Sequence, residues 1–157
     1  MSSRILFVCL GNICRSPTAE GVFRQRALAA GLPALQIDSA GTAGWHIGKA
    51  PDPRTIRAAA QRGYDLTPLR ARQVAPEDFH QFDFILAMDR SNLADLQAIR
   101  PSSSVAELGL FLDYASAFSE REVPDPYYGG DQGFEQVLDL IENASDGLIA
   151  RLRGVAV

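Results

Sequence analysis

Two residues near the N-terminus stand at a spacing that can support chemistry on an anion. Cys9 ends the apolar run that begins at Ile5, and five residues separate it from Arg15. A short loop can curl so that its backbone N–H groups point at one anion, while the positive end of the following helix faces the same point. The spacing therefore predicts an anion-binding loop with a thiol at one end and a guanidinium at the other.

The thiol and the guanidinium have complementary uses in phosphoryl transfer. Cationic groups and helix N-termini favour the thiolate, which is the nucleophilic form of a cysteine. Arg15 offers a planar fork of N–H donors that can hold two phosphoryl oxygens into a trigonal-bipyramidal transition state. Ser16 can donate a hydrogen bond to the Cys9 sulfur and stabilise it as a leaving group. We expect Cys9 to be the nucleophile and Arg15 the phosphate clamp.

A phosphate-binding loop is predicted between and just after these two residues. It consists of Leu10, Gly11, Asn12, Ile13, Cys14 and Ser16. Gly11 and Asn12 tolerate the left-handed dihedrals that a tight loop requires. Alternatively, Cys9 is only a small buried residue at a strand end. A buried strand end has no use for an unpaired guanidinium, so the combination favours catalysis.

The elements that must position this loop alternate between strands and helices. Short apolar runs predict strands at 5–9, 35–39, 84–87 and 105–110. Apolar residues at helical spacing predict helices at 17–30, 54–62, 76–82 and 91–100, and a last helix carrying apolar positions from Phe134 to Leu152. The alternation predicts an α/β fold, a doubly wound sheet of four parallel strands flanked by helices, with ligands at the carboxyl ends of the strands. Residues 1–157 lack repeats and linkers, which indicates a single domain.

Composition excludes several classes of protein. A net charge of -4 argues against nucleic-acid binding, and the run from Ile5 to Leu10 is too short for membrane insertion. Two cysteines without an export signal favour free thiols in the cytoplasm. Cys9 and Cys14 lack histidines at metal-binding spacing, and His46 and His80 are expected in loops or on the surface. We therefore expect no metal and no cofactor.

The segment 8–20, Val-Cys-Leu-Gly-Asn-Ile-Cys-Arg-Ser-Pro-Thr-Ala-Glu, resembles the signature of the low-molecular-weight protein tyrosine phosphatases. The resemblance continues in the family's order through 38–42, 71–74, 88–93 and 125–129, and so covers nearly the whole chain. It implies an enzyme that hydrolyses phosphotyrosine in proteins, and small aryl phosphates, through a phosphocysteine on Cys9. We also expect the protein to be a monomer in the cytoplasm. Inorganic phosphate would be the product.

The resemblance also assigns the residues that complete the site. A departing tyrosine side chain is a phenolate of pKa about 10, so a carboxylic acid at its oxygen should accelerate the reaction roughly a hundredfold or more. Sequence reasoning alone does not choose among 19 acidic residues, but the resemblance makes Asp125 the general acid and then the base. It places Trp45, Tyr127 and Tyr128 on the walls of the substrate pocket. For Trp45, packing on the core is an equal alternative.

Two features of the loop stay open. Cys14 is either a structural thiol or a redox partner that captures oxidised Cys9 as a disulfide. Many family members also carry a His shortly before the Ala-Arg-Gln segment that helps to hold the loop asparagine, whereas this chain reads Pro-Leu-Arg at 68–70. Ser39 or another group is then expected to orient Asn12.

Three alternative functions can be weighed against the sequence. An arsenate reductase of this fold would need cysteines after Cys14, and the sequence has none. In a protein-arginine phosphatase the position of Ile13 is typically Thr, so Ile13 favours phosphotyrosine. A non-catalytic phosphotyrosine-binding module would normally have lost Cys9 or Asp125, and both are present.

Overall fold

A computed structural model describes residues 3–32, 35–127 and 129–154. Its centre is a sheet of four parallel strands, β1 (Arg4–Cys9), β2 (Gln36–Gly41), β3 (Phe84–Ala87) and β4 (Glu107–Leu110). The strand order is β2-β1-β3-β4, so the chain passes from one side of β1 to the other between β2 and β3. The carboxyl end of β1 is therefore the topological switch point at which such sheets bind ligands. The predicted fold class is confirmed.

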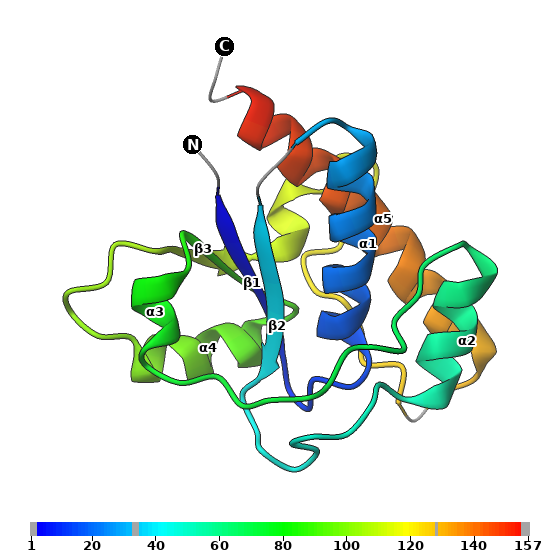
Figure 1. Ribbon diagram of the computed structural model, residues 1–157, viewed down its shortest axis with the longest axis horizontal. Coiled ribbons are helices and arrows are strands. Elements are labelled where there is room, and N and C mark those ends of the chain that lie inside the picture. Colours follow the sequence, from blue (N-terminus) through cyan, green and yellow to red (C-terminus); the bar gives the residue numbers. More distant parts are fainter. Residues whose placement is uncertain (1–2, 33–34, 128, 155–157) are drawn as a thin grey trace.

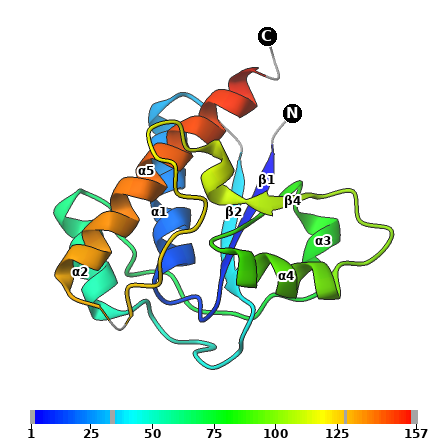
Figure 2. The same ribbon diagram turned by 180° about the vertical axis from the view of Figure 1, so that it is seen from behind.

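Helices cover both faces of the sheet (Figures 1 and 2). On one face lie α1 (Arg15–Ala29) and α5 (Asp131–Gly154), with α2 (Pro53–Gln61) packed on α5. The other face carries α3 (Asp78–Gln81) and α4 (Arg90–Ile99), and a 3-10 turn, η1 (Phe111–Tyr114), follows β4. None of the described helices is long and apolar enough to cross a membrane.

Strand β1 is buried on both faces, as its unbroken apolar run predicts. Phe7 belongs to the core shared with α1 and α5, where it meets Phe23 and Phe111 edge to face at centroid distances of 5.7 and 4.8 Å. Leu6 and Val8 point to the opposite core under α3 and α4. Packing from both sides fixes the height at which β1 ends and so the position of Cys9.

The ends of the elements follow local chemistry. Helix α1 begins at Arg15, two residues before the predicted start at Pro17, and ends where Gly31 takes a left-handed φ of +79°. Asp52 caps α2 by accepting a hydrogen bond from the Arg54 N–H at 2.8 Å. Strand β4 begins at Glu107 rather than at 105, and Val105 is 96% exposed. The loops after β1 and β2 gather at the carboxyl edge of the sheet (Figure 1).

Candidate active site

The Cys9 thiol lies where β1 ends and the next loop turns back. Its sulfur accepts a hydrogen bond from the Asn12 backbone N–H at 3.3 Å and lies 3.0 Å from the Ser16 hydroxyl oxygen. Helix α1 begins at Arg15 and directs its positive end toward this loop. All three features favour negative charge on the sulfur.

The turn of the loop depends on Asn12 rather than on Gly11. Asn12 has a φ of +58°, whereas Gly11 does not lie in the left-handed region. The prediction of left-handed dihedrals is therefore right for Asn12 and wrong for Gly11. A Cβ on Gly11 would come within 3.0 Å of His46 Cδ2, so a larger residue would crowd the imidazole that packs against the loop.

Side-chain hydrogen bonds of Asn12 hold the loop in place. Its amide nitrogen donates to Ser16 Oγ at 2.7 Å and to Ser39 Oγ at 3.0 Å. Its amide oxygen accepts from the Arg72 backbone N–H at 3.0 Å. Ser39 and the Arg72 backbone thus orient the asparagine. Ser39 was expected in this role because the chain lacks the family's usual histidine.

The order of donors leaves the Ser16 hydroxyl proton free to point at the Cys9 sulfur. Buried Glu20 accepts from Ser39 Oγ at 2.7 Å, which leaves Ser39 to accept from Asn12. Asn12 also donates to Ser16, so the Ser16 proton is available to the Cys9 sulfur at 3.0 Å, with the Ala40 carbonyl more distant at 3.4 Å. Burial raises the pKa of Glu20, while hydrogen bonds from Ser39 and Arg24 oppose this rise. A carboxylate at Glu20 therefore favours a hydroxyl that donates to the thiolate.

The guanidinium of Arg15 is buried and is held by hydrogen bonds to two distant segments of the chain. Its Nη1 donates to Asp89 Oδ2 at 2.6 Å and to the Val123 carbonyl at 3.1 Å. Its Nη2 lies 3.7 Å from Asp125 Oδ2. Because Nη1 is occupied by protein groups, the fork has a fixed orientation before any anion arrives.

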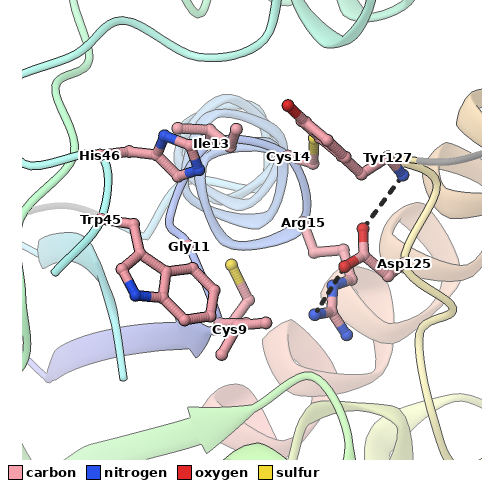
Figure 3. Close-up of a pocket in the computed structure, with 10 residues that line it drawn as sticks. Cys9, Gly11, Ile13, Cys14, Arg15, Trp45, His46, Asp125 and Tyr127 are labelled. Carbon is pink, nitrogen blue, oxygen red and sulfur yellow. Dashed lines mark hydrogen bonds and ion pairs between the residues drawn. The ribbon is translucent and has the colours of Figure 1, made fainter. Parts of the chain in front are cut away.

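Asp125 lies at the edge of the same site, with 41% of its side chain exposed. Its Oδ1 accepts from the Tyr127 N–H at 3.1 Å, while Oδ2 faces Arg15 (Figure 3). The preceding segment is anchored to the end of β3 by a hydrogen bond from the Val123 N–H to the Met88 carbonyl. One carboxylate oxygen thus makes the turn that the Asp-Pro sequence predicts, and the other remains directed toward the pocket.

A cavity of about 250 Å³ brings the predicted residues together. Figure 3 shows Trp45 and His46 facing Asp125 and Tyr127 across the thiol. Trp45 is 71% exposed at the pocket rim, so the alternative of packing on the core is wrong. Tyr128 lies outside the described residues. The lining consists of Cys9, Leu10, Gly11, Ile13, Cys14, Arg15, Trp45, His46, Asp125 and Tyr127.

Sequence reasoning missed Asp89 and His46. Asp89 follows closely after β3, which pairs with β1, and polar residues after neighbouring parallel strands meet at one edge of a sheet. That signal could have identified Asp89, which also caps α4 through a 2.7 Å bond from the Asn92 N–H. His46 had no comparable signal, because its place depends on the path of the loop after β2.

Cys14 is buried and lines the pocket wall. Burial raises the pKa of its thiol to about 12, so the thiol form dominates at neutral pH. Within 3–32, 35–127 and 129–154, no group of three or more His, Cys, Asp or Glu side chains is placed to hold a metal ion.

The sequence profile of the low molecular weight phosphotyrosine protein phosphatase family matches residues 4–155. The chain belongs to this family. A low molecular weight protein-tyrosine-phosphatase of Streptomyces coelicolor is 46% identical over 157 residues, which cover 98% of this chain and 95% of the relative. The phosphatase described here is thus a hydrolase and a protein tyrosine phosphatase, as the resemblance predicted.

Solved structures agree with this assignment. A protein tyrosine phosphatase of Entamoeba histolytica superposes on the phosphatase with a TM-score of 0.94 at 38% identity, covering 99% of each chain. A Drosophila arginine phosphatase superposes with a TM-score of 0.89 at 31% identity, covering 95% of this chain and 98% of that one. The fold is shared by phosphatases with different named substrates, so specificity must come from the pocket.

Proposed function

We propose that the phosphatase hydrolyses phosphotyrosine in two displacements at phosphorus, with Cys9 as the nucleophile. In the first, the thiolate forms a P–S bond while the P–O bond to tyrosine breaks, and Asp125 gives its proton to the departing phenolate oxygen. Arg15 Nη2 and the loop N–H groups hold the phosphoryl oxygens. The contacts of the Cys9 sulfur with Asn12 N–H and Ser16 Oγ carry this proposal.

The second displacement releases inorganic phosphate. Asp125, now a carboxylate, takes a proton from the attacking water, and the P–S bond breaks to return the Cys9 thiolate. Ser16 lies 3.0 Å from the sulfur and is oriented by Asn12, so its hydroxyl stabilises the leaving thiolate. One carboxyl group and one hydroxyl therefore serve both half-reactions.

The walls of the pocket favour a flat aromatic substrate. Trp45 and Tyr127 present rings at the rim, and Ile13 adds an apolar side chain. Phosphoarginine, the substrate class of the arginine phosphatases, has a cationic guanidinium that Ile13 cannot hydrogen-bond. We therefore assign phosphotyrosine in proteins, and small aryl phosphates, as the substrates. The assignment of Tyr128 to this wall stays a prediction.

We also propose the domain extent, location and oligomeric state of the phosphatase. The profile match over 4–155 supports one phosphatase domain spanning 1–157. Two free thiols suit a reducing cytoplasm, and we propose a cytoplasmic monomer that requires no cofactor and binds no nucleic acid. Hydrolysis of 4-nitrophenyl phosphate in the presence of a chelator tests the proposed reaction. Absence of turnover there would exclude it.

Asp125→Asn should lower kcat most for substrates with poor leaving groups. We expect kcat for phosphotyrosine to fall about a hundredfold or more, and kcat for 4-nitrophenyl phosphate to fall less, because nitrophenolate leaves with little need for a proton. The matched variant Asp113→Asn, an exposed side chain on η1, should change neither rate. Equal losses on both substrates would remove Asp125 as the acid.

Alkylation should distinguish the two cysteines. At neutral pH we expect iodoacetate to modify Cys9 and to leave Cys14 unmodified, because thiolates react and burial keeps Cys14 as the thiol. Peptide mass spectrometry gives the answer. Preferential labelling of Cys14 would reverse this conclusion.

A further inference from the structure

A second, larger groove lies beside the catalytic pocket. It has a volume of about 450 Å³ and is formed by the end of β1, the loop after β2, the segment 73–76 and the last turns of α4. Leu10 lines both the groove and the catalytic pocket, so this half-buried residue forms a ridge between two adjacent sites. The lining consists of Leu10, Thr42, Ala43, Gln73, Val74, Pro76, Asp95, Ala98 and Ile99.

The ridge between the two sites is fixed by hydrogen bonds. The Ala43 N–H donates to the Leu10 carbonyl at 3.0 Å, and the Gln73 side-chain amide donates to the Thr42 carbonyl at 3.2 Å. The Val74 N–H donates to the Gly41 carbonyl at 2.8 Å on the same edge of the sheet. The groove is therefore present before a ligand binds, and filling it costs little ordering of the protein.

The chemistry of the groove is apolar along its length and acidic at one side. Six of the nine lining residues are apolar: Leu10, Ala43, Val74, Pro76, Ala98 and Ile99. Asp95 is the acidic residue in the lining, and it makes no hydrogen bond or ion pair with the part of the chain that the structure describes. Such a surface suits a long side chain with an apolar stem and a cationic end.

We propose that this groove binds a lysine or arginine side chain of the substrate protein, close in sequence to the phosphotyrosine. The proposal rests on the proposed function, because it takes the tyrosine ring to lie in the catalytic pocket. In an extended peptide, residues two apart point to the same side and lie about 7 Å apart. A side chain at that spacing can cross the Leu10 ridge while its neighbour keeps the phosphate at Cys9. The stem packs on the apolar walls, and the cation approaches Asp95.

Phosphotyrosine peptides that differ at one position test the groove. Lys, Leu or Gly is placed two residues before or after the phosphotyrosine, and kcat/KM is compared with that for 4-nitrophenyl phosphate. We expect kcat/KM for the Lys peptide to exceed that for the Gly peptide by roughly fivefold to twentyfold at one of the two positions, mainly because KM is lower. Equal values for all peptides in the wild-type enzyme would overturn the proposal.

Two variants assign any preference to the groove. Ala98→Trp fills it and should remove the preference for Lys, while Ala94→Trp, also exposed on α4 but outside the lining, should preserve it. Asp95→Asn should lower kcat/KM for the Lys peptide roughly twofold to fivefold. Glu120→Gln, which changes an exposed acidic residue elsewhere, should leave this value unchanged. A preference for Leu over Lys, or one that survives Ala98→Trp, contradicts the proposed occupant.

The readout on 4-nitrophenyl phosphate separates this proposal from the catalytic one. Its hydrolysis needs only the catalytic pocket, so both groove variants should retain wild-type kcat/KM for it. If 4-nitrophenyl phosphate is hydrolysed but no peptide is preferred, only the proposal for the groove is overturned. Absence of turnover in the wild-type enzyme overturns the proposed function instead.

Discussion

Replacing Cys9 by serine should lower kcat for aryl phosphates by about 10⁴-fold or more. The loop, Arg15 and Asp125 all remain in the variant, but a serine hydroxyl is not ionised by a helix N-terminus and a few hydrogen bonds at neutral pH. Without a thiolate no P–S bond forms, and the binding groups alone cannot split the reaction into two steps. Steady-state hydrolysis of 4-nitrophenyl phosphate measures the loss directly.

The control for this variant is its ability to bind the product. Inorganic phosphate should still bind to Cys9→Ser, because Arg15 and the loop N–H groups are unchanged, and calorimetry can measure the affinity. Retained binding with lost turnover assigns the defect to chemistry. Activity within tenfold of wild type would exclude Cys9 as the nucleophile.

Arg15→Lys should produce the second largest loss, about a 10³-fold fall in kcat/KM. The guanidinium donates to Asp89 and Val123 through Nη1, and Nη2 faces Asp125 at 3.7 Å. We propose that Nη2 holds the phosphoryl group. A lysine has one compact ammonium that cannot meet the protein partners and the substrate together. The charge is unchanged, so the loss measures geometry rather than electrostatic attraction.

A matched variant makes this result specific. Arg121→Lys alters an exposed arginine that faces Asp113 at 3.7 Å, and it should leave kcat/KM unchanged. Thermal unfolding of Arg15→Lys shows how far the fold depends on the partly buried Arg15–Asp89 pair. A loss below tenfold, in a variant that is folded, would show that the forked geometry of Arg15 is not needed.

The sequence was most informative where chemistry and local structure coincide. The apolar run into Cys9 predicts a strand buried on both faces, and the strand and its core place the thiol at the switch point. The spacing to Arg15 and the start of a helix there are also local properties. These are the reasons why the fold class and the arrangement of the loop could be predicted from sequence.

What escaped prediction depends on contacts between distant segments. Asp89 reaches Arg15 across 74 residues, and a side chain on Gly11 would crowd His46 from the loop after β2. The buried Glu20 acts on the loop only through Ser39, 19 residues away. Pairings of this kind follow from the strand order and the path of loops, which local patterns do not specify.

The phosphocysteine itself offers the most direct test of the account. Rapid acid quenching during turnover of 4-nitrophenyl phosphate, followed by peptide mass spectrometry, should recover a phosphoryl group on the peptide that contains Cys9, and none in Cys9→Ser. A burst of one nitrophenol per enzyme should precede the steady state if the second displacement is slower. A phosphoryl group on any other residue, or transfer directly to water without a phosphoenzyme, would contradict the mechanism proposed here.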